Sequence, residues 1–137
     1  MNKVSRRIAG EMLILENAQT GESLRIHETV EGGVGRIAPD GELTAEMAND
    51  LEDELTSLAL LCEKIVIDMK GVSFISNSAI KKILELQHAV DARDGTLLIT
   101  GVGASIYKVF EEMGLESVFD IEKIDRPVIE ERTSDEM

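Results

Sequence analysis

Residues 64–84 read KIVIDMKGVSFISNSAIKKIL, and this stretch sets the expected fold. The aliphatic run 64–69 is typical of a β-strand that is buried on both faces of a sheet. A loop is expected over 70–75. A helix should start near Ser76, because apolar residues then recur at helical spacing. A strand, a loop and a helix in this order predict one unit of an α/β fold.

The flanking segments continue the alternation of strands and helices. The expected strands are Met12–Asn17, 23–31, 34–38, 96–100 and 118–121, and the expected helices are 44–62 and 103–114. Thr44 is a suitable N-cap for the first helix, and Pro39 to Gly41 should end the strand before it. Gly114 stands where a left-handed helix C-cap is expected. We therefore expect a mixed or mainly parallel sheet flanked by helices.

The chain divides into three parts. Residues 1–22 form an N-terminal extension with one possible extra strand, 23–122 form a single α/β domain, and 123–137 form an acidic tail. The extra strand at Met12–Asn17 could extend the sheet, cover its edge or pair with a second copy, so a homodimer is possible.

Composition excludes several classes of function. The chain has 137 residues and a net charge of −13, which argues against nucleic acid or an anionic membrane surface as the main partner. The longest aliphatic run, 58–62, is too short to span a bilayer, and Glu11 interrupts any signal-peptide pattern. Cys62 is the one cysteine, so a buried thiol in a cytoplasmic protein is expected.

No cofactor is expected, and the sequence shows no nucleophile–base pair that would indicate an enzyme. One cysteine and two histidines cannot form a usual zinc site, although a carboxylate site for magnesium or calcium stays open. Gly101 and Gly103 precede a helix, but an ordinary strand–helix turn is favoured there over a phosphate-binding loop.

Charge is unevenly distributed along the chain. The first expected helix carries an acidic run, for which a solvated face is favoured and a docking surface for a basic partner is the alternative. Its acidic residues are Glu46, Asp50, Glu52, Asp53 and Glu54. Residues 70–82, by contrast, contain Lys70, Lys81 and Lys82 and no acid.

The start of the second helix is the main candidate site. It follows a buried strand that ends in Asp68, so it lies at the carboxyl edge of the sheet, where α/β folds place functional groups. Ser76, Asn77 and Ser78 leave backbone N–H groups that could face an anion. Helix capping by Ser76, with Asn77 and Ser78 as polar first-turn residues, is the favoured interpretation.

The chain resembles the STAS domain of bacterial anti-sigma factor antagonists over roughly residues 23–122. The resemblance rests on the segment 64–84, on Gly114, Leu115, Phe119 and Ile121, and on the passage 41–45. It implies regulation by partner switching, in which the domain binds an ATP-dependent anti-sigma serine kinase. Phosphorylation of a serine or threonine at the start of the second helix then releases the partner.

The family's Asp-Ser-Ser-Gly or Asp-Thr-Ser-Gly motif aligns with Ser76, Asn77, Ser78 and Ala79. Asn77 stands at the phosphorylated position and cannot accept a phosphoryl group. Either Ser76 or Ser78 takes that role, or the protein docks without being switched, or it has another duty. Asp68 matches the family's acid at the strand end, where support of the loop by hydrogen bonds is favoured over catalysis.

The resemblance and the residues together predict a non-enzymatic regulatory protein that binds an anti-sigma serine kinase. The expected binding residues are Ser73, Ile75, Ser76, Asn77, Ser78, Lys81 and Lys82. The alternative is a cytoplasmic accessory subunit of a transport ATPase complex. A small-ligand or nucleotide-binding domain ranks lowest.

Overall fold

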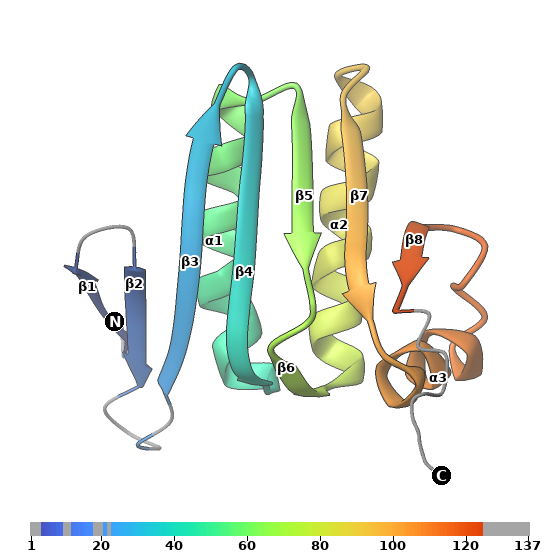
Figure 1. Ribbon diagram of the computed structural model, residues 1–137, viewed down its shortest axis with the longest axis horizontal. Coiled ribbons are helices and arrows are strands. Elements are labelled where there is room, and N and C mark those ends of the chain that lie inside the picture. Colours follow the sequence, from blue (N-terminus) through green and yellow to red (C-terminus); the bar gives the residue numbers. More distant parts are fainter. Residues whose placement is uncertain (1–3, 10–11, 18–20, 22, 125–137) are drawn as a thin grey trace, which may run out of the picture.

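A computed structural model describes residues 4–9, 12–17, 21 and 23–124 of the chain. Strands and helices alternate after an initial run of strands (Figure 1). The strands are β1 Val4–Ala9, β2 Met12–Asn17, β3 Ser23–Glu31, β4 Val34–Leu43, β5 Lys64–Asp68, β6 Val72–Ile75, β7 Thr96–Val102 and β8 Asp120–Lys123. The helices are α1 Ala45–Leu61, α2 Asn77–Ala92 and α3 Ala104–Glu112.

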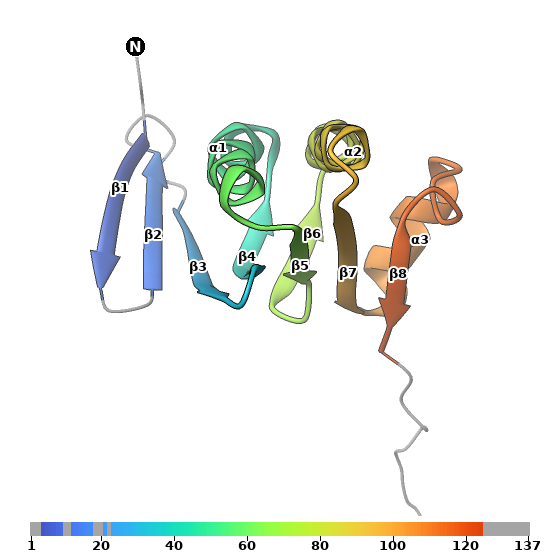
Figure 2. The ribbon, with the colours of Figure 1, turned by 90° about the horizontal axis from the view of Figure 1, so that it is seen from above.

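The sheet is mixed, as the sequence predicts. Its strands follow the order β1-β2-β3-β4-β5-β7-β8, with β6 pairing to the far end of β4. The first four strands are antiparallel neighbours, whereas β5, β7 and β8 run parallel to β4. Helices α1 and α2 lie side by side on one face (Figure 2), and α3 lies at the end of β7.

Most of the core fills the space between the sheet and the helices α1 and α2, and α3 adds Ile106 and Phe110 to it. Helix α1 buries Met47, Leu51, Leu55 and Leu58, because these residues recur every three or four positions on one stripe. Burial of such aliphatic side chains supplies the main stabilisation of the fold, about 1.5–3 kcal/mol for each large one. In β5, Ile65 and Ile67 belong to this core, while Val66 is also buried and alternates to the opposite face.

The N-terminal extension contains a hairpin where the sequence predicts one strand. Strand β2 is at the expected place, and β1 pairs with it in antiparallel register from Val4↔Asn17 to Ala9↔Met12. The sequence did not predict β1, because its basic residues interrupt the apolar pattern of a strand. Charged residues are common on edge strands. The predicted tail, 123–137, lies outside the described residues beyond Ile124.

Strand β4 is longer than predicted, since it continues through Pro39 and Gly41 to Leu43. Proline lacks the N–H that a central strand needs. Here β4 pairs with β5 only over 34–37 and with β6 only from Gly41 onward, so Pro39 lies in the gap between two neighbours. Strand β4 can therefore continue past Pro39, although proline usually ends a strand.

Two further boundaries differ from the expectation. The predicted loop 70–75 contains the short strand β6, which pairs in parallel with β4. The last strand, β8, lies two residues later than the predicted 118–121. Both segments are short and gain their strand structure from neighbours that are distant in sequence. Within the described residues, no helix has the length and apolar character needed to cross a membrane.

Candidate functional site

The candidate site lies where β4, β5, β6 and β7 end and α2 begins, at the lower edge of the sheet in Figure 1. Asp68 closes β5, and its Oδ1 accepts a hydrogen bond from the Lys70 backbone N–H at 2.9 Å. The next residue along, Met69, donates its N–H to the carbonyl of Thr100 on β7 at 2.8 Å. These bonds hold the loop that leads into β6, which is the support expected of Asp68.

Gly101 makes room for this loop. Its φ is +67°, a left-handed conformation that favours glycine. A Cβ at this position would lie 2.5 Å from Asp68 Oδ1 and 3.0 Å from the Lys70 nitrogen. Both the backbone conformation and the close approach of the loop therefore require glycine at this position.

Strand β6 contains a register shift that shapes the surface. Gly41 pairs with Val72, but the next residue of β4, Glu42, pairs with Phe74, so Ser73 is an extra residue in β6. An extra residue of this kind redirects the side chains that follow it. As a result Ser73 and Phe74 are both exposed, Phe74 by 49%, while Val72 and Ile75 are buried.

Helix α2 begins with a capped turn. The Ser76 Oγ accepts a hydrogen bond from the Ala79 N–H at 3.0 Å, as the N-cap interpretation predicts. The Ser76 N–H donates to the carbonyl of Leu43 at 2.9 Å, which fixes the start of the helix to the end of β4. Asn77 and Ser78 are then the first two helical residues, and both are exposed.

Most of the predicted binding residues meet on this surface. Ser73, Asn77, Ser78 and Lys81 are exposed, and Ser76 is half-buried by its capping role. Ile75 is the exception, because it is 3% exposed and packs in the core. Its side chain has no surface to offer a partner, so the prediction that it contacts one is wrong.

Phe74 belongs to the surface but was not among the predicted binding residues. The chain has only three phenylalanines and one tyrosine, which makes a half-exposed phenylalanine conspicuous. Exposed aromatic side chains are common anchors at protein interfaces. The sequence could not assign its direction, because that depends on the register shift between β4 and β6.

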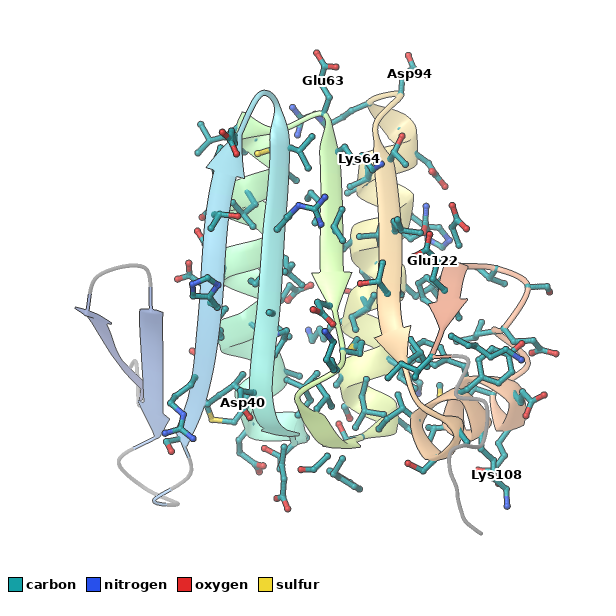
Figure 3. All side chains as sticks on the ribbon, in the orientation of Figure 1. Asp40, Glu63, Lys64, Asp94, Lys108 and Glu122 are labelled. Carbon is teal, nitrogen blue, oxygen red and sulfur yellow. The ribbon has the colours of Figure 1, made fainter. Side chains whose placement is uncertain are left out.

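The charge of the surface is mixed and not basic. Lys70 and Lys81 are exposed, but Lys82 forms an ion pair with α1, in which its Nζ lies 3.4 Å from Glu52 Oε1. Carboxylates also come from β4, where Glu42 is the pairing partner of Phe74 and Asp40 lies at the same end of the strand (Figure 3). Of the three lysines of 70–82, Lys82 thus pairs with an acid of α1, and the carboxylates of β4 add negative charge to the same end of the sheet.

Comparison with known proteins gives a family and a fold. A family model described as the STAS domain matches residues 24–128. The matched region omits the β1–β2 hairpin, which is an addition to the domain. A search of curated proteins finds no match.

Several solved structures share the fold. The anti-sigma factor antagonist SpoIIAA in its unphosphorylated form is 16% identical with a TM-score of 0.64, covering 73% of this chain and 88% of that chain. An anti-sigma factor antagonist from Mycobacterium paratuberculosis is 17% identical with a TM-score of 0.66, covering 77% and 87%. A sulfate transporter family protein from Wolinella succinogenes is 22% identical with a TM-score of 0.59, covering 71% and 83%.

Proposed function

The chain belongs to the STAS domain family, and from that premise we propose that it is a non-enzymatic regulatory protein of the anti-sigma factor antagonist type. Its partner is an anti-sigma serine kinase, which binds the surface formed by β6 and the start of α2. The observation that carries the proposal is the clustering of Phe74, Asn77, Ser78 and Lys81 as exposed side chains on that surface. We call these four residues the α2-start surface.

Asn77 determines whether the family's usual phosphorylation can regulate this chain. It occupies the family's phosphorylated position, and its amide cannot become a phosphate ester. Ser76 is a poor substitute because its hydroxyl caps the helix, and its phosphorylation would disturb the bond to the Ala79 N–H. Ser78 is exposed in the first turn, so it is the better acceptor.

A phosphate at Ser78 would add about −1.5 to −2 charges to the surface that also carries the exposed Phe74. The helix N-terminus would tolerate this charge, because its unpaired N–H groups favour anions. The main effect would fall on the partner, whose surface was packed against a neutral side chain. Phosphorylation at this position therefore weakens binding without unfolding α2.

The proposal is tested by mixing the purified chain with the anti-sigma serine kinase of its own organism and ATP. We expect the wild type to bind, and mass spectrometry to find phosphate at Ser78 or nowhere in 71–81. Asn77→Ser should restore phosphorylation at position 77 and make the complex dissociate with ATP. Failure of both the wild type and Asn77→Ser to bind would exclude this function.

A second candidate is an accessory subunit of a transport ATPase complex. It is supported by the similarity of the fold to the sulfate transporter family protein from Wolinella succinogenes. The test is affinity purification of the tagged chain from its own organism. A stoichiometric transport ATPase in the eluate, lost with Phe74→Ser, would favour this candidate over the kinase.

A further inference from the structure

The opposite end of the sheet carries a second exposed apolar surface. Helix α1 ends there with Leu60 and Leu61, which are 70% and 73% exposed. They are out of phase with the buried stripe, which continues through Leu58 to Cys62. Two adjacent leucines therefore face solvent at a place where the fold itself does not use them.

A pocket lies beside these leucines. Its volume is about 430 Å³, and it is formed by the last turns of α1 and α2 and the segments that follow them. Ala59, Cys62 and Val90 contribute its buried apolar lining, and Leu60 and Leu61 form part of its wall. We call this feature the apical pocket; it is large enough for one or two aliphatic side chains of a partner.

Hydrogen bonds fix the walls of the apical pocket. The Arg93 guanidinium donates to the carbonyl of Ala59, which ties the end of α2 to the end of α1. The Gly95 N–H donates to Val90 O at 2.9 Å, and the Thr96 N–H donates to Glu63 O at 2.9 Å. The pocket is therefore preformed, and a ligand would not have to order it.

The charge at the rim indicates what kind of segment fits. Glu63 and Asp94 are exposed and point outward from this end of the molecule (Figure 3). Among residues 23–124, neither carboxylate forms an ion pair, and the lining of the pocket holds these two carboxylates against one cation, Arg93. Apolar side chains together with lysine or arginine would complement this surface.

We propose that the apical pocket docks an amphipathic, basic segment of a second protein, with its apolar side chains against Leu60 and Leu61 and its cations against Glu63 and Asp94. A second copy of this chain fits less well. A two-fold contact would bring together two rims that each carry the carboxylates of Glu63 and Asp94 against the single guanidinium of Arg93, and like net charges at an interface are unfavourable. The site is separate from the α2-start surface, so one chain could hold two partners.

The proposal is tested with a synthetic helical peptide of leucine and lysine, titrated into the isotope-labelled full chain and followed by amide NMR. A matched peptide of leucine and glutamate controls for charge. We expect the largest shifts in 59–63 and 90–95 with the basic peptide, and binding at least tenfold weaker with the acidic one. Equal binding of both peptides would overturn the proposal, and so would shifts centred on the acidic run 46–54.

Variants then test the apolar contacts and the charge contacts of the apical pocket separately. Leu60→Ser combined with Leu61→Ser should weaken the basic peptide at least tenfold, and fold is checked by an unchanged amide spectrum elsewhere. Glu63→Gln with Asp94→Asn should remove most of the salt dependence; asparagine is chosen because Asp94 has a φ of 60°. Phe74→Ser, at the other end, should change nothing.

Two results would decide against a basic partner. Unchanged affinity in the leucine double variant would place the peptide elsewhere. If sedimentation instead showed a dimer of the free chain that the same double variant abolishes, that result would assign the pocket to a second copy. The kinase-binding test uses the opposite surface, so its failure leaves this test unaffected.

Discussion

The two ends of the sheet are bounded by the same pair of helices, yet they present different surfaces. Where α2 begins, a capped turn leaves Asn77 and Ser78 exposed to solvent, shortly after the exposed Phe74 in the chain. Where α1 ends, two exposed leucines border the apical pocket. The first surface presents polar side chains beside a single aromatic ring, and the second presents apolar side chains that the core does not use.

The sequence signals these two surfaces in different ways. Small polar residues before an apolar helical stripe indicate a helix start, whatever they bind. By contrast, the leucines lie within the aliphatic run 58–62, where composition alone does not separate core from surface. Only the helical phase, set by Leu58 and Cys62, shows that Leu60 and Leu61 point away from the core.

The largest expected effect concerns the loop that supports the α2-start surface. Gly101→Ala places a Cβ 2.5 Å from Asp68 Oδ1 in a left-handed backbone conformation. We expect a loss of about 2–4 kcal/mol in the free energy of unfolding. Urea denaturation measures it. Gly103→Ala is the matched control, because no atom lies within 4 Å of its Cβ and its φ is −78°. Equal losses in the two variants would refute the steric argument.

Binding of the anti-sigma kinase should distinguish the two ends most directly. Phe74→Ser removes the one aromatic side chain of the α2-start surface, and we expect affinity to fall about 10–100-fold. Leu61→Ser, which removes a comparable apolar side chain at the other end, should leave the affinity unchanged. Isothermal titration calorimetry measures both. If the leucine variant lost more affinity than Phe74→Ser, the kinase would bind at the apical pocket.

The sequence predicted most of the fold because most of its signals are local. The N-caps Thr44 and Ser76 are where they were expected, and Gly114 has the left-handed φ of 70° expected after a helix. Strand β6 was missed because it depends on pairing with β4, about 30 residues earlier in the chain. Propensity within so short a segment carries little information about such a partner.

The candidate site was predicted in outline but not in its side-chain directions. Ser73, Asn77, Ser78 and Lys81 are on the surface, as their polarity suggests. Ile75 was expected to contact a partner, but it is buried, and Phe74 is exposed instead. Both directions follow from the register shift at Gly41 and Glu42. A register shift depends on two strands at once, so neither strand reveals it alone.

A smaller effect is expected for the cap of α2. Ser76→Ala removes the acceptor of the Ala79 N–H, and we expect the free energy of unfolding to fall by about 1 kcal/mol. Ser78→Ala keeps the cap, and its effect should stay within about 0.5 kcal/mol. Thermal denaturation compares the two. If Ser78→Ala were the more damaging change, its hydroxyl would have a structural role, and our choice of it as phosphate acceptor would need revision.

The smallest effect concerns Asp50 on α1, the helix that links the two ends. Burial, and then the neighbouring charge of Asp53, raise the pKa of Asp50 above its ordinary value of 3.8. The folded state therefore binds this proton more tightly than the unfolded state, and stability falls as pH rises from 3.8 through the raised pKa.

Asp50→Asn should accordingly stabilise the chain at pH 7 and have no effect near pH 3, where both forms are neutral. Because the site is largely solvated and screened, we expect a gain below about 0.5 kcal/mol, typical of relieving like charges on one helix. Urea midpoints at the two pH values measure it. Glu46→Gln is the control with the opposite sign, because Glu46 lies in the first turn and its charge favours the helix N-terminus. A loss of stability for Asp50→Asn at pH 7 would show that the Asp50 charge stabilises α1.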